Sequence, residues 1–173
     1  MMMTLNDTIS YLKEHDGYLL VTHIRPDGDT LGSAAALCSI LRKLGKTAYI
    51  YDNPETTETY KDVTSPFLPH DGFKADHLIV IDLASERLFP KGFVSSLTFD
   101  LCIDHHPTNT GYADNLFCDP SKASCGELVL QIADALGLMD SDIASLLYIA
   151  VPFSPKKESI TPLMGFSQTR WLT

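Results

Sequence analysis

The stretch Val21-Thr-His-Ile-Arg-Pro-Asp-Gly-Asp-Thr-Leu-Gly-Ser33 decides the fold, because it joins a predicted strand to a predicted helix through a polar turn. Residues 18–22, which lead into it, read as a buried strand. Pro26 and Gly28 cannot continue that strand and favour a tight turn. Residues 31–44 then carry apolar side chains at helical spacing. Strand, polar turn and helix in this order are typical of the carboxyl edge of a parallel sheet, where α/β proteins bind ligands.

Three side chains of this turn are candidate metal ligands, namely His23, Asp27 and Asp29. One imidazole with two carboxylates suits a divalent cation. The alternative is a turn stabilised by its own Asp side chains, with Asp29 or Thr30 capping the following helix. The turn alone leaves both interpretations open.

The composition indicates one globular domain. The chain has 173 residues, 45% of them hydrophobic, which suffices for one core of ordinary size. A net charge of −9 argues against binding of long duplex nucleic acid, but permits a short anionic substrate held through metal ions. The sequence has neither a targeting segment nor a long apolar run, so we expect a cytoplasmic protein that does not contact a membrane. The cysteines lack metal-binding spacing, and we expect reduced core thiols at Cys38, Cys102, Cys118 and Cys125.

Two further predicted strands also end in polar side chains. Residues 77–82 form an apolar run that ends on Asp82. The alternative role for Asp82 is a cap of the next turn. Residues 99–107 form the other strand, and their end carries three adjacent polar residues, Asp104, His105 and His106. An Asp can accept the second ring N–H of a metal-bound His, whereas a solvated polar turn is the alternative.

The rest of the chain alternates between helical and strand patterns. The predicted helices cover residues 4–15, 125–136 and 140–150, and the predicted strands cover 47–51 and 112–118. Residues 52–76 are polar and rich in proline, so we expect irregular structure with one helical turn at 56–61. Together these patterns predict an α/β fold with a mainly parallel sheet and helices on both faces.

In such a sheet the polar strand ends converge, because parallel strands bring their carboxyl ends to one edge. Carboxylates crowded at that edge repel one another unless cations are present. Two divalent ions that share a bridging carboxylate are a known device for phosphoryl hydrolysis.

Three motifs together resemble the DHH phosphoesterase superfamily: Thr22-His-x-x-Pro-Asp-Gly-Asp29, Ile81-Asp82, and Asp104-His-His106 followed by Pro-Thr-Asn-Thr-Gly-Tyr-Ala-Asp114. Within it they look like the branch of bifunctional oligoribonucleases and phosphatases of 3′-phosphoadenosine 5′-phosphate (pAp). The resemblance runs from the first strand to Ala150. It implies a Rossmann-like DHH domain over residues 1–151.

The resemblance also implies two Mn²⁺ ions as cofactors, with Mg²⁺ as the alternative cation. One ion would be bound by His23, Asp27 and Asp82. The second would be bound by Asp29, Asp82 and His105, so that Asp82 bridges the two. A water ionised between the ions would attack phosphorus in line.

The catalytic roles that the resemblance implies fall on Asp104 and His106. His106 would contact the substrate phosphate, and Asp104 would orient a neighbouring imidazole. Arg25 is basic and near the same turn, so it is either a phosphate contact or an ordinary surface arginine, and we expect the latter.

Two features depart from the family pattern. No Asp occurs after Asp142, although the family has a further Asp that completes the second metal site. The family's C-terminal DHHA1 domain, which grips the substrate, is also missing from this sequence. Residues 152–173 change in composition, and we interpret them as a non-matching tail that is disordered or derived from a frameshift. The alternative is a naturally short relative with a disordered tail.

The function implied is Mn²⁺-dependent hydrolysis of short oligoribonucleotides (nanoRNA) and pAp. The partner would then be short RNA or a nucleotide, with a homodimer left open. One alternative is a weak or inactive remnant that binds one metal ion or none. Another is a DHH enzyme that acts on cyclic or linear dinucleotides. A regulatory nucleotide-binding protein without metal is disfavoured, because the polar turn lacks a Gly-rich phosphate loop.

Overall fold

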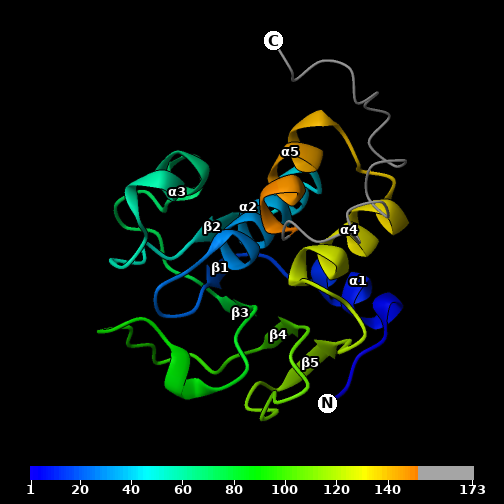
Figure 1. The fold of residues 1–173 in the computed structure, drawn as a ribbon, viewed down its shortest axis with the longest axis horizontal. Helices are drawn as coiled ribbons and strands as arrows, with labels where there is room; N and C mark the ends of the chain where they lie inside the picture. Colours follow the sequence, from blue (N-terminus) through cyan, green and yellow to red (C-terminus); the bar gives the residue numbers. More distant parts are fainter. Residues whose placement is uncertain (152–173) are drawn as a thin grey trace.

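Five strands form one sheet in the order β2-β1-β3-β4-β5 (Figure 1). The computed structural model describes residues 1–151, and all four neighbouring strand pairs in it are parallel. The strands are β1 (Tyr18–Val21), β2 (Ala48–Ile50), β3 (His77–Ile81), β4 (Leu101–Asp104) and β5 (Asn115–Cys118). The predicted α/β class and parallel sheet are confirmed, and all five carboxyl ends lie at one edge.

The helices occupy the segments where the sequence predicts them, with small shifts of their ends. They are α1 (Leu5–Glu14), α2 (Gly28–Lys43), α3 (Glu58–Thr64), α4 (Cys125–Leu136) and α5 (Ser141–Ala150). Two short 3₁₀ turns, η1 (Ser65–Phe67) and η2 (Glu86–Leu88), were not predicted. In the proline-rich region, α3 and η1 together replace the single helical turn expected there.

The α-helices of residues 1–151 lie on one face of the sheet, with α5 packed on α2 and α4 (Figure 1). Ile79, Ile81 and Ile103 point from the sheet into the main core, which they share with α1, α2, α4 and α5. The opposite face carries Val80 and Cys102, and it is covered by residues of the connections that follow β3 and β4. Helices on both faces were expected, but irregular segments and η2 cover this second face.

The direction in which the strands are added explains the difference between the faces. The connection from β1 to β2 leads one way along the sheet, whereas the connections from β3 to β4 and from β4 to β5 lead the other way. Because parallel crossovers are right-handed, connections in opposite directions lie on opposite faces. The connections after β3 and β4 contain no α-helix, so they cover the second face with loops and η2. The connection from β2 to β3 contains α3, which packs against α2 on the first face.

Close packing of α5 on α2 explains a glycine of the polar-turn motif. A Cβ added to Gly32 would lie 2.7 Å from both the backbone nitrogen of Ala150 and the carbonyl oxygen of Leu146. No side chain larger than hydrogen fits at that distance without a shift of one helix. Gly32 therefore lets α5 support the start of α2, where the polar turn enters the helix.

The amino-terminal residues cover the outer edge of β5, which the sequence did not reveal. Met3 N–H donates to the carbonyl oxygen of Leu116 (2.8 Å), and Leu116 N–H donates to the carbonyl oxygen of Met1 (2.8 Å). This short parallel pairing satisfies backbone groups of an edge strand that would otherwise be exposed.

The thiol prediction agrees with the structure. All four cysteines are free; Cys38, Cys102 and Cys125 are buried and Cys118 is partly buried. Within residues 1–151, every helix is too short or too polar to cross a lipid bilayer. The proposed tail, residues 152–173, lies outside the described residues.

Candidate metal centre

The polar turn after β1 holds His23 against two carboxylates. His23 Nε2 lies 3.8 Å from Oδ1 of Asp27 and 3.8 Å from Oδ2 of Asp82. The other ring nitrogen, Nδ1, lies 2.7 Å from the carbonyl oxygen of Ile24. A carbonyl oxygen only accepts, so Nδ1 carries a proton and Nε2 is the lone-pair nitrogen of the neutral ring. The backbone thus turns the ligating nitrogen toward the carboxylates.

Asp27 also begins α2. Its Oδ1 accepts hydrogen bonds from the backbone N–H groups of Asp29 (3.0 Å) and Thr30 (3.2 Å). Asp27 is therefore the N-cap residue, and not Asp29 or Thr30, which the alternative interpretation of the turn named as the cap. A cap fixes the carboxylate at the helix start, where the partial positive charge of the helix stabilises it.

Asp82 follows β3 in a backbone conformation that non-glycine residues rarely adopt. Its φ of 56° is in the left-handed region. The residue is 4% exposed, and its buried Oδ1 accepts no hydrogen bond among residues 1–151. Asp82 therefore does not cap the next turn, which was the alternative role. A strained backbone and a buried oxygen without a donor are typical of a functional site.

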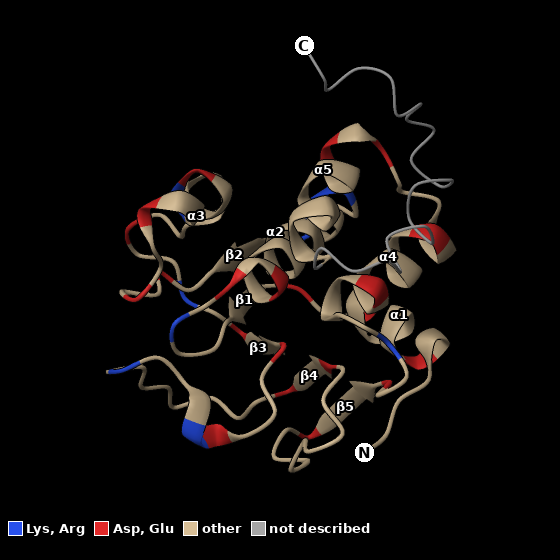
Figure 2. Cartoon of the chain, in the orientation of Figure 1, with Lys and Arg blue, Asp and Glu red and all other residues tan. Residues whose placement is uncertain are grey.

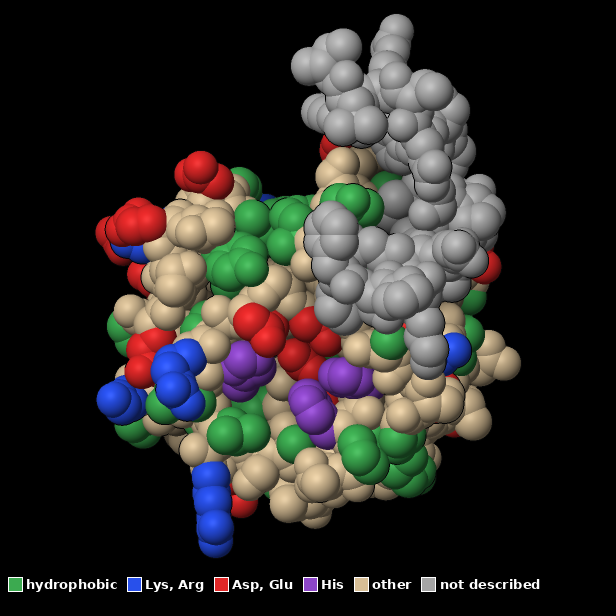
Figure 3. Space-filling model, in the orientation of Figure 1, with side chains coloured by type: hydrophobic (Ala, Val, Ile, Leu, Met, Phe, Trp, Pro, Cys, Tyr) green, Lys and Arg blue, Asp and Glu red, His purple; other side chains and the backbone are tan. Residues whose placement is uncertain are grey.

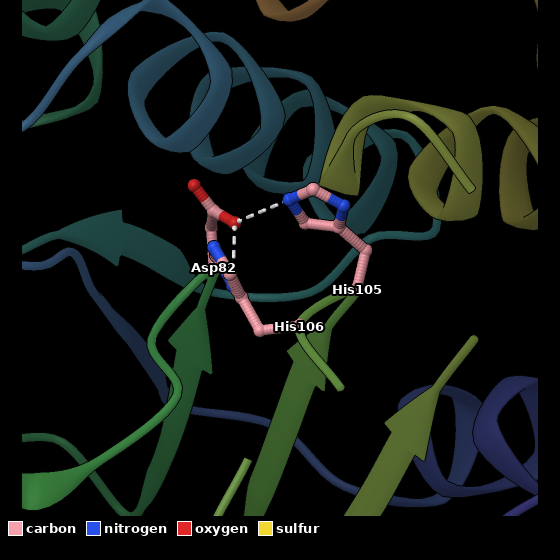
Figure 4. A group of neighbouring side chains, drawn as sticks. All are labelled: Asp82, His105 and His106. Atoms are coloured by element: carbon pink, nitrogen blue, oxygen red, sulfur yellow. Dashed lines mark ion pairs between the residues drawn. The ribbon is translucent and has the colours of Figure 1, made fainter. Parts of the chain in front are cut away.

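Asp82 lies between two groups of candidate ligands. Its Oδ1 is 3.4 Å from His105 Nε2 and 3.6 Å from His106 Nδ1 (Figure 4). Its Oδ2 faces His23 and Asp27 on the other side. Within each group, the atoms able to bind a metal lie within 4.8 Å of one another. Asp82 is the residue that the two groups share.

Asp104 holds His106, a member of one of these two groups, by a hydrogen bond. Asp104 is fully buried, and its Oδ1 accepts from His106 Nδ1 (2.7 Å) and from the backbone N–H of His105 (2.8 Å). Its Oδ2 accepts from the side-chain amide of Asn109 (2.6 Å). Because Nδ1 of His106 is bound to Asp104, the ring acts on a ligand through Nε2. Sequence reasoning missed Asn109, whose only signal was its place in the segment after His106.

Asp29 connects α2 to α4. Its Oδ2 accepts from the backbone N–H of Cys125 (2.9 Å), and its Oδ1 accepts from the N–H of Gly126 (3.0 Å) and the hydroxyl of Ser33 (3.2 Å). The same Oδ2 lies 3.6 Å from His105 Nε2. Asp29 thus reaches the histidine expected to share its metal ion, and it also stabilises the amino-terminal end of α4.

The electrostatics indicate an excess of negative charge in the metal-free site. Burial, together with the charge of Asp82, raises the pKa of Asp29 to about 7, although two backbone N–H groups oppose this. The nearby Asp82 carboxylate, whose Oδ1 lies 3.4 Å from Nε2, raises the pKa of His105 to about 9 despite partial burial. Burial lowers the pKa of His23, but contacts with Asp27, Ile24 and Asp82 outweigh it and the pKa is raised. Without metal ions, the site therefore binds protons, which reduce its excess negative charge.

These residues fit divalent cations. Carboxylate oxygens and imidazole nitrogens are suitable donors for Mn²⁺. A cation beside Asp82 would give its buried Oδ1 the partner that it lacks in residues 1–151 and would neutralise the crowded carboxylates. Acidic residues lie where the chain leaves the strands at this edge (Figure 2). Histidine and acidic side chains gather on one open face of the molecule (Figure 3).

A cavity of about 500 Å³ opens beside the cluster and is lined by His23, Ile24, Arg25, Asp82, Leu88 and His106. Ligand pockets in proteins commonly have volumes of roughly 300–1,000 Å³. The cavity is therefore large enough for a ligand the size of a nucleotide.

The fold and the cluster define an α/β protein with a candidate divalent-metal site at the carboxyl edge of its sheet. The family model described as "DHH family, N-terminal domain" matches residues 18–151. Since this covers most of the chain, the protein belongs to the DHH family of phosphoesterases.

Two curated relatives are bifunctional oligoribonuclease and PAP phosphatase NrnA proteins. The chain is 32% identical to that of Thermus thermophilus over 139 residues, covering 73% of this chain and 40% of the relative. It is 28% identical to that of Bacillus subtilis over 129 residues, covering 73% of this chain and 41% of the relative. The chain thus spans less than half the length of these two relatives.

Solved structures share the fold at low identity. An exopolyphosphatase-related protein from Bacteroides fragilis is similar with a TM-score of 0.67 at 19% identity, over 91% of this chain and 55% of that one. The exonuclease RecJ bound to manganese gives a TM-score of 0.50 at 15% identity, over 87% of this chain and 43% of that one.

Proposed function

We propose that this chain is the catalytic DHH domain of a Mn²⁺-dependent phosphoesterase that hydrolyses short oligoribonucleotides and pAp. The observation that carries the proposal is the position of Asp82, whose two oxygens face two separate groups of candidate ligands. The NrnA relatives named above support the choice of substrates.

The candidate ligands fall into two sets, and each set would hold one ion together with Asp82. His23 and Asp27 would hold one ion with Asp82, and Asp29 and His105 would hold the other with it. Such ions lower the pKa of a water molecule and neutralise negative charge on a phosphate.

The residues of the chain orient these ligands before any substrate binds. The carbonyl oxygen of Ile24 fixes His23 with Nε2 toward the carboxylates. The carbonyl oxygen of Lys122 lies 3.3 Å from Nδ1 of His105 and orients that ring in the same way. Both imidazoles thus present Nε2 to the site without a change of tautomer.

His106 is placed to bind the substrate phosphate. It lines the cavity next to Asp82, and its Nδ1–H is held by Asp104. When Nε2 is protonated it donates to a phosphate oxygen, and the buried Asp104 carboxylate stabilises the resulting positive charge. Asp104 and His106 therefore act as one unit toward the phosphate.

The partners that follow are a short RNA or a nucleotide, in a cytoplasmic setting. Residues 143–173 contain no Asp, whereas the family pattern has a further Asp for the second ion after the helix that corresponds to α5. The second candidate is therefore a chain that binds the second ion weakly and hydrolyses little substrate.

The test is hydrolysis of pAp and of a short oligoribonucleotide by this chain with Mn²⁺, alongside an Asp82→Ala variant. Linear and cyclic dinucleotides serve as further substrates. Release of phosphate or mononucleotide that the variant abolishes supports the proposal. Rates equal to those of the variant, from protein whose circular dichroism shows a folded chain, contradict it and favour the remnant.

A further inference from the structure

We propose that Arg25 binds a second phosphate of the substrate, on the same nucleoside as the phosphate that is hydrolysed. This inference rests on the proposed function, because it assigns a role within the same cavity. The sequence alone favoured an ordinary surface arginine at this position. Four observations of the structure point instead to a phosphate subsite.

The first observation is location. Arg25 lines the cavity together with Asp82 and His106, and basic side chains lie beside the histidine and acidic patch in Figure 3. Asp82 is 4% exposed, whereas Arg25 is exposed. Arg25 therefore belongs to the outer part of the cavity and Asp82 to its floor. A phosphate at Arg25 would be a different one from the phosphate at the floor.

The second observation is the backbone of Arg25, which has a φ of 52° in the left-handed region. Only Arg25 and Asp82 adopt a positive φ among the non-glycine residues of the described chain. Such a conformation is unfavourable for a residue with a side chain and persists where surrounding contacts enforce it. Both of these strained residues line the same cavity.

The third observation is that the loop around Arg25 is held on both sides. The N–H of Ile24 donates to the carbonyl oxygen of Leu88 (2.6 Å). The side-chain amide of Asn53 donates to the carbonyl oxygen of His23 (2.9 Å). Pro26, directly after Arg25, is buried. The side chain of Arg25 thus extends from a fixed backbone, which lowers the entropy lost when it binds a ligand.

The fourth observation is the lack of a partner for the guanidinium. Across residues 1–151, Arg25 makes no side-chain hydrogen bond, ion pair or cation–π contact. Arg42, by contrast, donates to the carbonyl oxygens of Ala48 (2.9 Å) and Pro66 (3.0 Å) and lies over the rings of Tyr49 and Phe67. Arg42 is a structural residue, whereas Arg25 keeps all its donors available.

The chemistry of the cavity indicates which ligand these donors meet. A guanidinium forms paired hydrogen bonds with phosphate oxygens. Ile24 and Leu88 add apolar wall to the same cavity, which suits a sugar or base. A nucleoside with phosphates on both its 3′ and 5′ oxygens has this arrangement, and so does each internal nucleoside of an oligonucleotide.

The kinetic test compares Arg25→Gln, Arg25→Lys and the control Arg87→Gln, which changes an exposed arginine outside the cavity lining. The substrates are pAp and adenosine 3′-monophosphate, with Mn²⁺. Arg25→Gln should raise KM for pAp roughly tenfold or more, as expected for loss of a hydrogen bond to a charged group. It should leave kcat for pAp and KM for the monophosphate within about twofold. Arg25→Lys should be intermediate, and Arg87→Gln unchanged.

A binding test separates this inference from the proposed function, because it requires no turnover. Calorimetry with the Mn²⁺-loaded chain measures the Kd of adenosine 5′-monophosphate and of adenosine. Tenfold weaker binding of the monophosphate by Arg25→Gln, with adenosine unaffected, supports the inference even if the chain hydrolyses nothing. Equal effects on both ligands, no effect, or no binding of the monophosphate to the wild type overturns the inference. These binding results neither require nor exclude hydrolysis of pAp, which is the test of the proposed function.

Discussion

The two ends of the parallel sheet both hold histidine beside carboxylate, but only one end leaves these groups without complete partners. At the amino end, His77 Nδ1 lies 3.1 Å from the hydroxyl of Tyr11 and 3.2 Å from Oδ1 of Asp100. Oδ2 of Asp100 accepts from the N–H of Leu78 (2.8 Å). His15 stacks on Tyr11, with ring centroids 4.3 Å apart. Each of these groups has a protein partner.

The carboxyl end differs in its hydrogen bonding and in its backbone. Oδ1 of Asp82 is buried without a donor, and the residue has a left-handed φ. Within the described residues, the groups of side chains that are arranged to hold a metal both include Asp82. Proximity of His and Asp therefore does not by itself define a ligand site. The decisive sign is a buried polar atom that packing leaves unsatisfied.

The largest expected effect comes from Asp82→Ala. Loss of the shared carboxylate should remove both ion sites and lower the rate of pAp hydrolysis on the order of 10³-fold, because metal ions supply several kcal/mol of transition-state stabilisation. The rate is measured as phosphate release with Mn²⁺. Asp100→Asn, at the other end of the sheet, is the matched control and should retain the wild-type rate. Equal losses of rate in the two variants would show that the two ends of the sheet do not differ in function.

A smaller effect is expected from Asn109→Ala. The variant removes the amide that holds Oδ2 of Asp104 and so loosens the support of His106. We expect a loss of roughly 10–100-fold in kcat, the usual range for residues that orient a catalytic ligand. The free energy of unfolding should also fall by about 1–3 kcal/mol, because Oδ2 of the buried Asp104 loses its donor, so kcat is measured on protein shown to be folded.

Asn115→Ala is the matched control for that variant. The side chain of Asn115 donates to the carbonyl oxygen of Asp100 (3.0 Å) at the amino end. Its loss should leave kcat within about twofold of the wild type. A kcat for Asn109→Ala that equals the kcat of this control would show that Asn109 does not support His106.

Substitutions at the amino end of the sheet should instead change the stability of the fold. Asp100→Ala leaves His77 and the N–H of Leu78 without a carboxylate partner, which should lower the free energy of unfolding by about 1–3 kcal/mol. Urea denaturation measures this change. Asp82→Asn in the metal-free chain should not lower the free energy of unfolding, since it removes a buried charge beside Asp29. If Asp82→Asn destabilised the metal-free chain as much as Asp100→Ala does, Asp82 would be a structural residue.

The stability of the metal-free chain should depend on pH through groups at the carboxyl end of the sheet. The pKa of Asp29 rises from 3.8 to about 7 on folding, so the folded chain keeps a proton that the unfolded chain releases between these values. The contribution of this bound proton to the free energy of unfolding is complete below about pH 4 and is lost as the pH rises to 7. For His105, raised from 6.5 to about 9, the contribution is present below 6.5 and is lost as the pH rises through 9.

Tm should therefore fall by several degrees from about pH 5 to pH 9 in chelator, since each kcal/mol corresponds to roughly 2–4 °C for a chain of this size. Saturating Mn²⁺ should flatten the decline, because ions replace the protons. Identical slopes with and without Mn²⁺ would mean that these groups do not bind the ions.

Much of the sheet and its polar edge was predictable from local sequence. The apolar runs before Asp82 and Asp104 each form a buried parallel strand, and the ends of these strands bring Asp82, His105 and His106 together. The hydrophobic pattern determines such strands because both of their faces are buried.

Other features depend on contacts between distant residues, which periodicity does not encode. Asp29 binds the N–H groups of Cys125 and Gly126, nearly one hundred positions along the chain. The pairing of Met3 with Leu116 and the left-handed φ of Asp82 likewise arise from the assembled fold. The alternative interpretation of the turn put the cap of α2 at Asp29 or Thr30, two or three residues too late, because Asp and Thr are all good capping residues and only the backbone geometry distinguishes them.

The most direct test of the central claim, that Asp82 bridges two ions, is the Mn²⁺ stoichiometry of the chain. Calorimetric titration, with electron paramagnetic resonance of free Mn²⁺ as a second readout, should give two ions per chain for the wild type. The folded Asp82→Ala variant should show no binding in the same concentration range, whereas Asp100→Asn should bind two. One ion per wild-type chain, none, or two ions in Asp82→Ala would contradict the account.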